Sequence, residues 1–402
     1  MAGILDGTRK ERVVALCSEL IREKSYSGEE SGVAELLMRF FRASGFDEAR
    51  TDEYGNAIGG VRGSGAGPVI LFDGHMDTVP VGDERAWKQD PFGARIEGGR
   101  LYGRGTSDMK GAIAAMASAI AFFIEDRGRG FPGSIHLAGV VHEECFEGVA
   151  ARRISASVKP DYVVIGEASE LDLKIAQRGR AEIVVETFGV PAHSASPEKG
   201  VNAVYQMLRL VDAIRRIEPP AHPVLGKGIL ELTDIKSSPY PGASVVPAYC
   251  RSTYDRRLLV GETRESVLAP ISAAIGELAA SDPKFSATAG YARGKERCWT
   301  GAEIEGERFF PGWVCGESED YIVETIKAMR SGGLSPRISK YNFCTNGSHY
   351  AGEAGIRTIG YGPSCEHLAH TIDEYVELDQ LYAAAEGYYR IIEGLQKAGI
   401  PR

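Results

Sequence analysis

The sequence predicts an α/β protein whose central mixed sheet, flanked by helices, is interrupted by a smaller inserted α+β domain. Strand-like and helix-like segments alternate over the first part of the chain, and a run in the order β-α-β-β-α-β follows before the alternation resumes. A chain of 402 residues is also too long for one ordinary hydrophobic core. We therefore expect a main domain formed by residues 1–177 and 294–402, with residues 178–293 inserted.

In the first part of the main domain, charged and apolar residues alternate at helical spacing and then give way to short apolar runs. Helical patterns cover residues 9–23 and 29–43, and strand-like runs cover 57–61, 69–72, 134–141 and 162–165. The longest apolar run, Ala112–Ile124, is well short of the roughly 20 residues that span a bilayer. It predicts a buried helix and no membrane partner.

The insertion begins where Gln177-Arg178-Gly179-Arg180 is followed by a strand-like segment of alternating apolar and polar residues. Amphipathic helical patterns cover 202–217 and 265–278, and strand-like runs cover 181–190, 228–238, 244–258 and 285–292. About 115 residues in this order make a self-contained α+β unit.

Composition excludes several classes of function. The charges sum to 46 − 55 = −9 and no basic run occurs, so nucleic acid is not an expected partner. The amino-terminal residues mix charges into their apolar turns, unlike a secretory signal. Seven cysteines are scattered and never spaced as CxxC, which is typical of reduced thiols in a cytoplasmic protein.

The segment LFDGHMDTVP ends an apolar run in His75 and Asp77. The carboxyl ends of strands are where α/β sheets bind ligands, and residues two apart on a strand point the same way. His75 could therefore bind a metal through one ring nitrogen while the Asp77 carboxylate accepts a proton from the other. A capped strand end with a structural histidine is the alternative.

Asp108 lies just before a long helix, in the Gly-rich segment GRLYGRGTSDMKG. An aspartate at a helix start is most often an N-cap, but the same position lets a carboxylate project from a rigid edge toward a metal. Lys110, in the first helical turn, is unfavourable beside the helix dipole. It indicates a local requirement other than helix stability.

Two further strands end in acidic residues, one at Glu143–Glu144 and the other at Glu167. Adjacent carboxylates at the end of a buried strand repel each other and are unfavourable without a nearby cation. Neighbouring side chains point in different directions, so one could bind a metal while the other faces a bound water. A solvated acidic loop is the alternative.

Together these segments deliver imidazole and carboxylate groups to what could be one edge of one sheet. That mixture of ligands suits Zn, Co or Mn. No serine or cysteine has a plausible catalytic triad around it, so no covalent intermediate is expected. We interpret the histidines outside the motifs as structural or surface groups: His136, His142, His222, His349 and His367.

The motifs GHMDTVP, GRGTSDMKG, HEE, GEAS and GYGPSCEHLAHTIDEYV resemble, in order and spacing, the dinuclear zinc metallopeptidase family. That family holds acetylornithine deacetylase, succinyl-diaminopimelate desuccinylase, aminoacylases and glutamate carboxypeptidase. QRGRAEI, GVPAHSASPEKGVNA and YDRRLLVGET are similar to its branch of selenium metabolism-linked hydrolases. The resemblance covers nearly the whole chain and implies a zinc-dependent exopeptidase-like catalytic domain with an inserted ferredoxin-like lid or dimerisation domain.

The resemblance also implies a role for each matching residue. It makes His75 and Glu167 ligands of one metal ion and Glu144 and His370 ligands of a second, with Asp108 bridging both. Without it, His370 could not be chosen over the other late histidines. Two divalent ions are therefore expected, Zn first and Co or Mn as alternatives.

Further roles follow from the same resemblance. Glu143 matches the general base, and Asp77 matches the carboxylate behind the metal-binding histidine. His193 matches the inserted-domain histidine that reaches the neighbouring subunit's active site and helps to bind the reacting carbonyl oxygen. Arg256 and Asn346 match positions that contact substrate, although the family's usual Gly-Gly-Thr segment is replaced here by Thr-Asn-Gly-Ser.

The implied activity is hydrolysis of the amide bond of an N-acylated amino acid or a similar small amine. A dipeptidase or carboxypeptidase, and a hydrolase of ureido or aromatic C–N bonds, are alternatives that share the same metal chemistry. A non-catalytic binding protein is a third, which the intact acid pair disfavours. The expected partners are a small-molecule substrate and a second copy of the chain, bound through the inserted domain.

Overall fold

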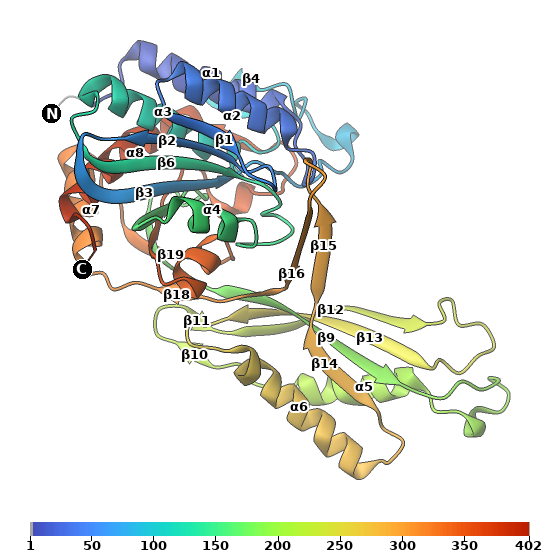
Figure 1. The fold of residues 1–402 in the computed structure, drawn as a ribbon. Coiled ribbons are helices and arrows are strands. Elements are labelled where there is room, and N and C mark those ends of the chain that lie inside the picture. The colour runs from blue at the N-terminus through green and yellow to red at the C-terminus, as the bar shows by residue number, and fades with distance from the viewer. Residues whose placement is uncertain (1–2, 402) are drawn as a thin grey trace. The chain divides into compact units, whose positions relative to one another are not determined.

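A computed structural model describes residues 3–401 of the chain (Figure 1). It divides into two compact units. The main unit contains the chain up to Gln177, Lys295–Glu305 and the chain from Val314 onward, and the inserted unit contains Arg178–Gly294 and Gly306–Trp313. A mixed sheet flanked by helices in one unit and an α+β arrangement in the other confirm the predicted fold class.

One short segment lies outside the boundaries expected from the sequence. Gly306–Trp313 was expected in the main domain but belongs to the inserted unit. Within it, β17 (Phe309–Phe310) pairs with β9 (Gly179–Phe188). Two residues are too few to show a strand pattern, so this return of the chain to the inserted unit could not be predicted from the sequence.

The main unit is built on a mixed sheet with the strand order β1-β2-β6-β3-β7-β20-β8-β18, with β19 also paired to β8. Its members are β1 (Glu48–Thr51), β2 (Ala57–Arg62), β3 (Gly65–His75), β6 (Pro132–Val140), β7 (Tyr162–Ile165), β8 (Leu173–Gln177), β18 (Trp313–Val314), β19 (Ile338–Tyr341) and β20 (Arg357–Gly360). The central strands β6, β3, β7 and β20 are neighbours and run parallel. Their carboxyl ends therefore meet at one edge.

Helices of the main unit pack on this sheet and on one another. They are α1 (Gly7–Arg22), α2 (Ser31–Ala43), α3 (Lys110–Arg127), α4 (Ala151–Val158), α7 (Asp320–Ser331) and α8 (Leu378–Ala398). The predicted buried helix is α3, which is apolar around most of its circumference and packs against α1, α8, β3 and β6. Within residues 3–401, no helix combines the length and the hydropathy needed to cross a membrane.

A small sheet beside the main one joins two distant segments. β4 (Arg95–Glu97) and β5 (Arg100–Tyr102) form a hairpin, and β21 (Tyr375–Glu377) pairs with β5. The chain that leads into Asp108 is thereby held beside the chain that follows His370.

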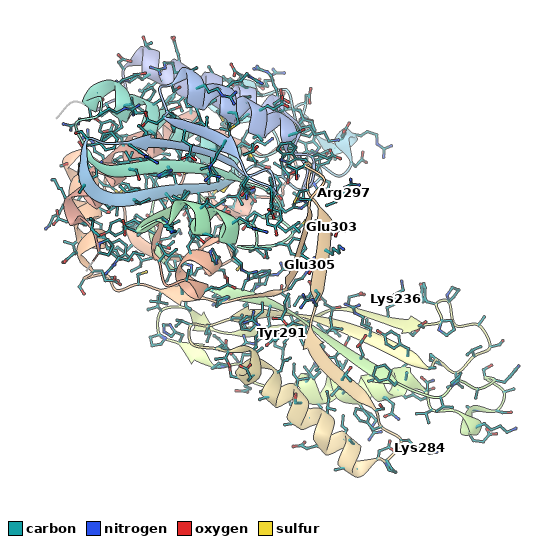
Figure 2. All side chains as sticks on the ribbon, in the orientation of Figure 1. Lys236, Lys284, Tyr291, Arg297, Glu303 and Glu305 are labelled. Atoms are coloured by element: carbon teal, nitrogen blue, oxygen red, sulfur yellow. The ribbon has the colours of Figure 1, made fainter. Side chains whose placement is uncertain are left out.

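The inserted unit contains β9, α5 (Ala203–Ile214), β12 (Ile229–Ser238), β13 (Tyr249–Leu258), α6 (Arg264–Ser281) and β14 (Ala287–Tyr291) in that order. Its antiparallel sheet has the order β12-β13-β9-β14, the ferredoxin-like arrangement. Alternate residues of β9, such as Ile183 and Val185, are buried in one core with Leu210 of α5. Figure 2 shows Tyr291 at the end of β14, where its hydroxyl donates to the Arg264 carbonyl at the start of α6.

Candidate metal centre

The main unit contains two overlapping groups of side chains with metal-ligating atoms. His75, Asp108 and Glu167 form one group, and Asp108, Glu144 and His370 form the other; in each, the ligand atoms lie within 4.8 Å of one another. The structure thus brings together all five residues that the resemblance implies as ligands. They come from the ends of β3 and β7, from loops after β5 and β6, and from the loop that follows β20.

Asp108 belongs to both groups because its two carboxylate oxygens face different histidines. Its Oδ1 lies 2.8 Å from His75 Nε2, and its Oδ2 lies 3.1 Å from His370 Nε2. Glu167 Oε1 lies 3.6 Å from His75 Nε2, while Glu144 lies 3.1 Å from His370 Nε2. This is the geometry that a bridging carboxylate requires.

The orientation of His75 is set from the side away from the other ligands. Its Nδ1 lies 2.8 Å from the main-chain carbonyl oxygen of Asp77 and 3.6 Å from the Asp77 carboxylate. The sequence predicted the carboxylate as the acceptor, whereas the nearer acceptor is the carbonyl. Donation from Nδ1–H leaves Nε2 facing Asp108 and Glu167, which is the tautomer that a metal ligand needs.

The Asp77 carboxylate is buried and ties two strand ends together. It accepts hydrogen bonds from the Ser27 hydroxyl at 2.7 Å and from the main-chain N–H groups of Glu143 and Glu144 at 3.1 and 3.2 Å. The acid pair is therefore held beside His75 by its backbone. Sequence reasoning missed Ser27, because a serine in a loop carries no signal of its own.

The pKa values of the cluster are shifted because several carboxylates lie close together and are shielded from water. Burial, with the charges of neighbouring carboxylates, raises the pKa of Glu143 and Glu167 well above their ordinary values and also raises that of Glu144. Burial also acts to raise the pKa of Asp108, but hydrogen bonds from the two histidines hold it well below its usual range. Hydrogen bonds to Asp108 and Glu144 raise the pKa of His370 to about 10.

Carboxylates gathered this closely out of water favour positive charge between them, which divalent cations would supply. The donor set of two imidazoles and three carboxylates suits Zn, Co or Mn. Glu143 Oε1 is buried and has no hydrogen-bond partner among the described residues, which leaves it available to a solvent molecule at the site. The residues therefore fit a dinuclear metal centre.

Lys110 proves to be fully buried behind the Asp108 loop. Its Nζ donates to the Glu23 carbonyl at 2.7 Å, and burial lowers the pKa of the ammonium to about 7. The unfavourable position beside the helix dipole is thus explained by a buried contact between α3 and the end of α1. Such a contact cannot be read from the sequence.

Two of the remaining predicted residues lie in the inserted unit. His193 is exposed in the loop between β9 and α5, and its Nδ1 accepts a hydrogen bond from Ala195 N at 3.0 Å. That bond leaves Nε2 as the protonated nitrogen. Arg256 is 4% exposed, and its guanidinium donates to the Glu262 carboxylate and to the carbonyl of Arg257, contacts internal to that unit.

Asn346 lies beneath the acid loop with both polar atoms of its side chain occupied. Its Nδ2 donates to Asp73 at 2.9 Å, and its Oδ1 accepts from Gly148 N at 2.8 Å. Tyr350 donates to the other oxygen of Asp73 at 2.8 Å. Asn346 therefore joins β3 to the loop that follows Glu144, and contact with a substrate would require it to release one of these partners.

The structure also contains a hydrogen-bonded series of serine, histidine and glutamate that the sequence did not reveal. Ser155 Oγ lies 2.7 Å from His349 Nε2, and His349 Nδ1 lies 2.9 Å from Glu353. Arg152, however, binds both oxygens of Glu353 at 2.9 and 2.7 Å and neutralises it. Ser155 is also the fifth residue of α4, so its own main-chain N–H lies within the helical hydrogen-bonding pattern. The series is a structural link between α4 and the segment after Asn346.

Comparison with known proteins agrees with this geometry. Residues 71–394 match the family described as Peptidase family M20/M25/M40. An uncharacterised Escherichia coli protein, YgeY, is 30% identical over 380 residues, which cover 93% of this chain and 92% of that protein. A succinyl-diaminopimelate desuccinylase of Cereibacter sphaeroides is 28% identical over 94% of this chain and 98% of its own length.

Solved structures show the same fold. The aminopeptidase PepT of Bacillus cereus superposes with a TM-score of 0.75 at 20% identity, covering 98% of this chain and all of that one. At this level of identity the likeness concerns the fold.

The buried position of Asn346 leads to a test of its role. We expect Asn346→Ala to lower the free energy of unfolding by about 2–4 kcal/mol, since a carboxylate oxygen of Asp73 and the N–H of Gly148 would each be left buried without a partner. Urea unfolding measures this. Asn342→Ala, which removes only an exposed contact with Glu366, is the matched control and should change stability by less than about 0.5 kcal/mol. A raised KM with unchanged stability would instead identify Asn346 as a substrate contact.

Proposed function

The chain belongs to peptidase family M20/M25/M40 and is a metal-dependent amidohydrolase; from this premise we propose that it removes the acyl group from an N-acylated amino acid or a similar small amine. The observation that carries the proposal is the pair of ligand groups that share Asp108, with Glu143 unligated beside them. Similarity to a desuccinylase over nearly the whole chain favours a deacylase over a peptidase.

In this proposal, His75 and Glu167 would hold one metal ion, Glu144 and His370 would hold the other, and Asp108 would contribute to both. Zn is the preferred metal, with Co or Mn as alternatives. When bound, the two ions would supply Lewis-acid polarisation of the scissile carbonyl and would lower the pKa of a water molecule at the site.

Glu143 is proposed as the general base and then the general acid. Its backbone is fixed by the hydrogen bond from its N–H to Asp77, and its free Oε1 can take a proton from water. Burial raises the pKa of Glu143 above its ordinary value, which makes its carboxylate a stronger proton acceptor than an exposed glutamate. The carboxylate would then deliver that proton to the departing nitrogen.

His193 is proposed to donate from Nε2–H to the oxygen of the reacting carbonyl as negative charge develops there. The hydrogen bond from Ala195 N to Nδ1 fixes the tautomer that has this proton. The family resemblance implies that such a histidine acts in the active site of a neighbouring subunit, so the proposal includes a homodimer formed through the inserted unit.

The inserted unit offers a surface suited to a second copy of the chain. β12 is an edge strand of its sheet, and an edge strand presents unpaired main-chain groups to another strand. Ile229 and Ile235 on β12 are 42% and 44% exposed, and Tyr205 and Leu208 on α5 are 67% and 51% exposed. Pairing of two such edges would cover these apolar side chains.

The substrate class and the metal requirement can be tested together. A panel of N-acetyl and N-succinyl amino acids, dipeptides and ureido acids should show turnover of the acylated amino acids first. Removal of metal by a chelator should abolish that turnover, and Zn, Co or Mn should restore it. Preference for dipeptides or ureido acids would replace the deacylase proposal by the corresponding alternative.

Replacement of Glu143 tests the proposed base. We expect Glu143→Gln to keep two bound metal ions per chain while turnover falls by about 10²–10⁴-fold or more, since the proton acceptor is lost and the ligands are not. Metal analysis by mass spectrometry and steady-state kinetics are the measurements. Substantial remaining activity would contradict the assignment.

Mixed dimers test the role of His193 across the interface. His193→Ala and Glu143→Gln should each be inactive as homodimers, and their mixture, after dissociation and reassociation, should regain partial activity. A mixed dimer would contain one site with an intact Glu143 and the partner's intact histidine. If reassociated mixtures stay inactive while mass measurement shows heterodimers, His193 does not act in trans.

A further inference from the structure

We propose that Glu374 is the positioning residue for the bridging carboxylate of Asp108, with Arg104 as its buried counter-charge. Neither residue is a ligand in the two groups described above. The proposal rests on the proposed function only in taking Asp108 and His370 as metal ligands. The proposal adds to that function the residues that fix the positions of Asp108 and His370 relative to each other.

A single oxygen of Glu374 binds the backbone of the Asp108 loop. Glu374 Oε1 accepts hydrogen bonds from the main-chain N–H groups of Gly105, Ser107 and Asp108 at 3.0, 2.8 and 3.1 Å. Three N–H groups that converge on one oxygen form a concave anion site, here filled by the protein's own carboxylate. The last of them belongs to Asp108, so the base of the bridging side chain is held directly.

The second oxygen of Glu374 is bound by Arg104. The Arg104 Nη1 donates to Oε2 at 2.6 Å, and both side chains are almost fully buried. The main chain adds a further link, because Gly103 N donates to the Glu374 carbonyl oxygen at 2.9 Å. All four groups that meet the Glu374 carboxylate are donors, so only an ionised carboxylate satisfies them together.

The same contacts reach the segment that carries His370. Glu374 follows His370 by four residues, and Arg104 Nη1 also donates to the Thr371 carbonyl at 3.2 Å. The loop with the bridging ligand and the segment with the other late ligand are thereby joined at one point. We infer that the second ligand group cannot keep its geometry when this point is broken.

The expected loss of metal affinity can be judged from other metal sites, where residues that hydrogen-bond to a ligand fix its orientation. Loss of a residue that orients a ligand typically reduces metal affinity or activity by about 10–100-fold. Glu374→Gln keeps the shape but presents an amide N–H₂ either to the three N–H groups or to Arg104. Either the three main-chain N–H groups or the Arg104 guanidinium must then face the N–H groups of the glutamine amide, and hydrogen bonds are lost.

The decisive experiment compares Glu374→Gln with a matched control in the full chain. Glu386→Gln alters another buried glutamate–arginine pair, in which Arg390 binds Glu386 at 2.9 and 2.8 Å on α8, and Glu386 belongs to neither ligand group. Zn²⁺ and Co²⁺ affinities are measured by competition with a chelating indicator, and the visible spectrum of the Co²⁺ form is recorded. Thermal unfolding is followed in parallel.

We expect Glu374→Gln to lose about 10–100-fold in affinity for at least one ion and to change the Co²⁺ spectrum, with KM nearly constant at saturating metal. Glu386→Gln should change thermal stability alone. Arg104→Lys, which keeps the charge but not the shared contact with Thr371, should show a smaller loss of affinity. Should Glu374→Gln not fold, this variant decides the proposal.

Wild-type metal affinity and Co²⁺ spectrum in Glu374→Gln, or in Arg104→Lys where that variant decides, would overturn the positioning role and leave the proposed function standing. Absence of bound metal in the unsubstituted chain would instead overturn the proposed function, and the positioning role with it. The two failures are therefore distinguishable before any substrate is added.

Discussion

Mutual repulsion among buried carboxylates is the constraint on which the main unit depends. Asp77, Asp108, Glu143, Glu144 and Glu167 gather at one edge of the central sheet, mostly out of water. Such a group is stable only if each oxygen meets a donor or a cation. The surrounding residues supply hydrogen-bond donors to outer oxygens of this group. The inner oxygens lie close to one another in the arrangement that divalent cations would stabilise.

The donors are mainly backbone N–H groups held in place by residues far away in the sequence. The Asp77 carboxylate accepts hydrogen bonds from the main-chain N–H groups of the acid pair and from the Ser27 hydroxyl. The Glu374 carboxylate accepts hydrogen bonds from main-chain N–H groups of the Asp108 loop. Asn346 connects Asp73 with the loop after Glu144. Rigid placement of ligands by such outer contacts is what a metal site requires for affinity and for catalysis.

The candidate ligand atoms and a set of exposed apolar residues lie in different units of the chain. The ligand atoms all lie in the main unit, where neighbouring parallel strands end together. The inserted unit has its own core and carries the exposed apolar residues of β12 and α5. His193 lies in a loop of this second unit, where its tautomer is fixed locally.

The sequence by itself determined the fold class, most of the elements and most of the residues that gather at the candidate metal centre. Apolar runs that stop at His75, Glu144 and Glu167 are local signals, and parallel strands bring such ends to one edge. His370 has no local signal, since it follows no strand directly, and it was identified through the family resemblance alone.

Only the tertiary structure decided which groups hold those ligands in place. Ser27, Arg104 and Glu374 act through contacts with residues 50 to 270 positions away, and the partner of an isolated polar side chain cannot be read from local pattern. The same reason applies to Asn346, which resembles a substrate contact in the sequence but is buried between Asp73 and Gly148. Periodicity reports which face of an element is buried, whereas hydrogen-bond partners depend on how distant elements pack.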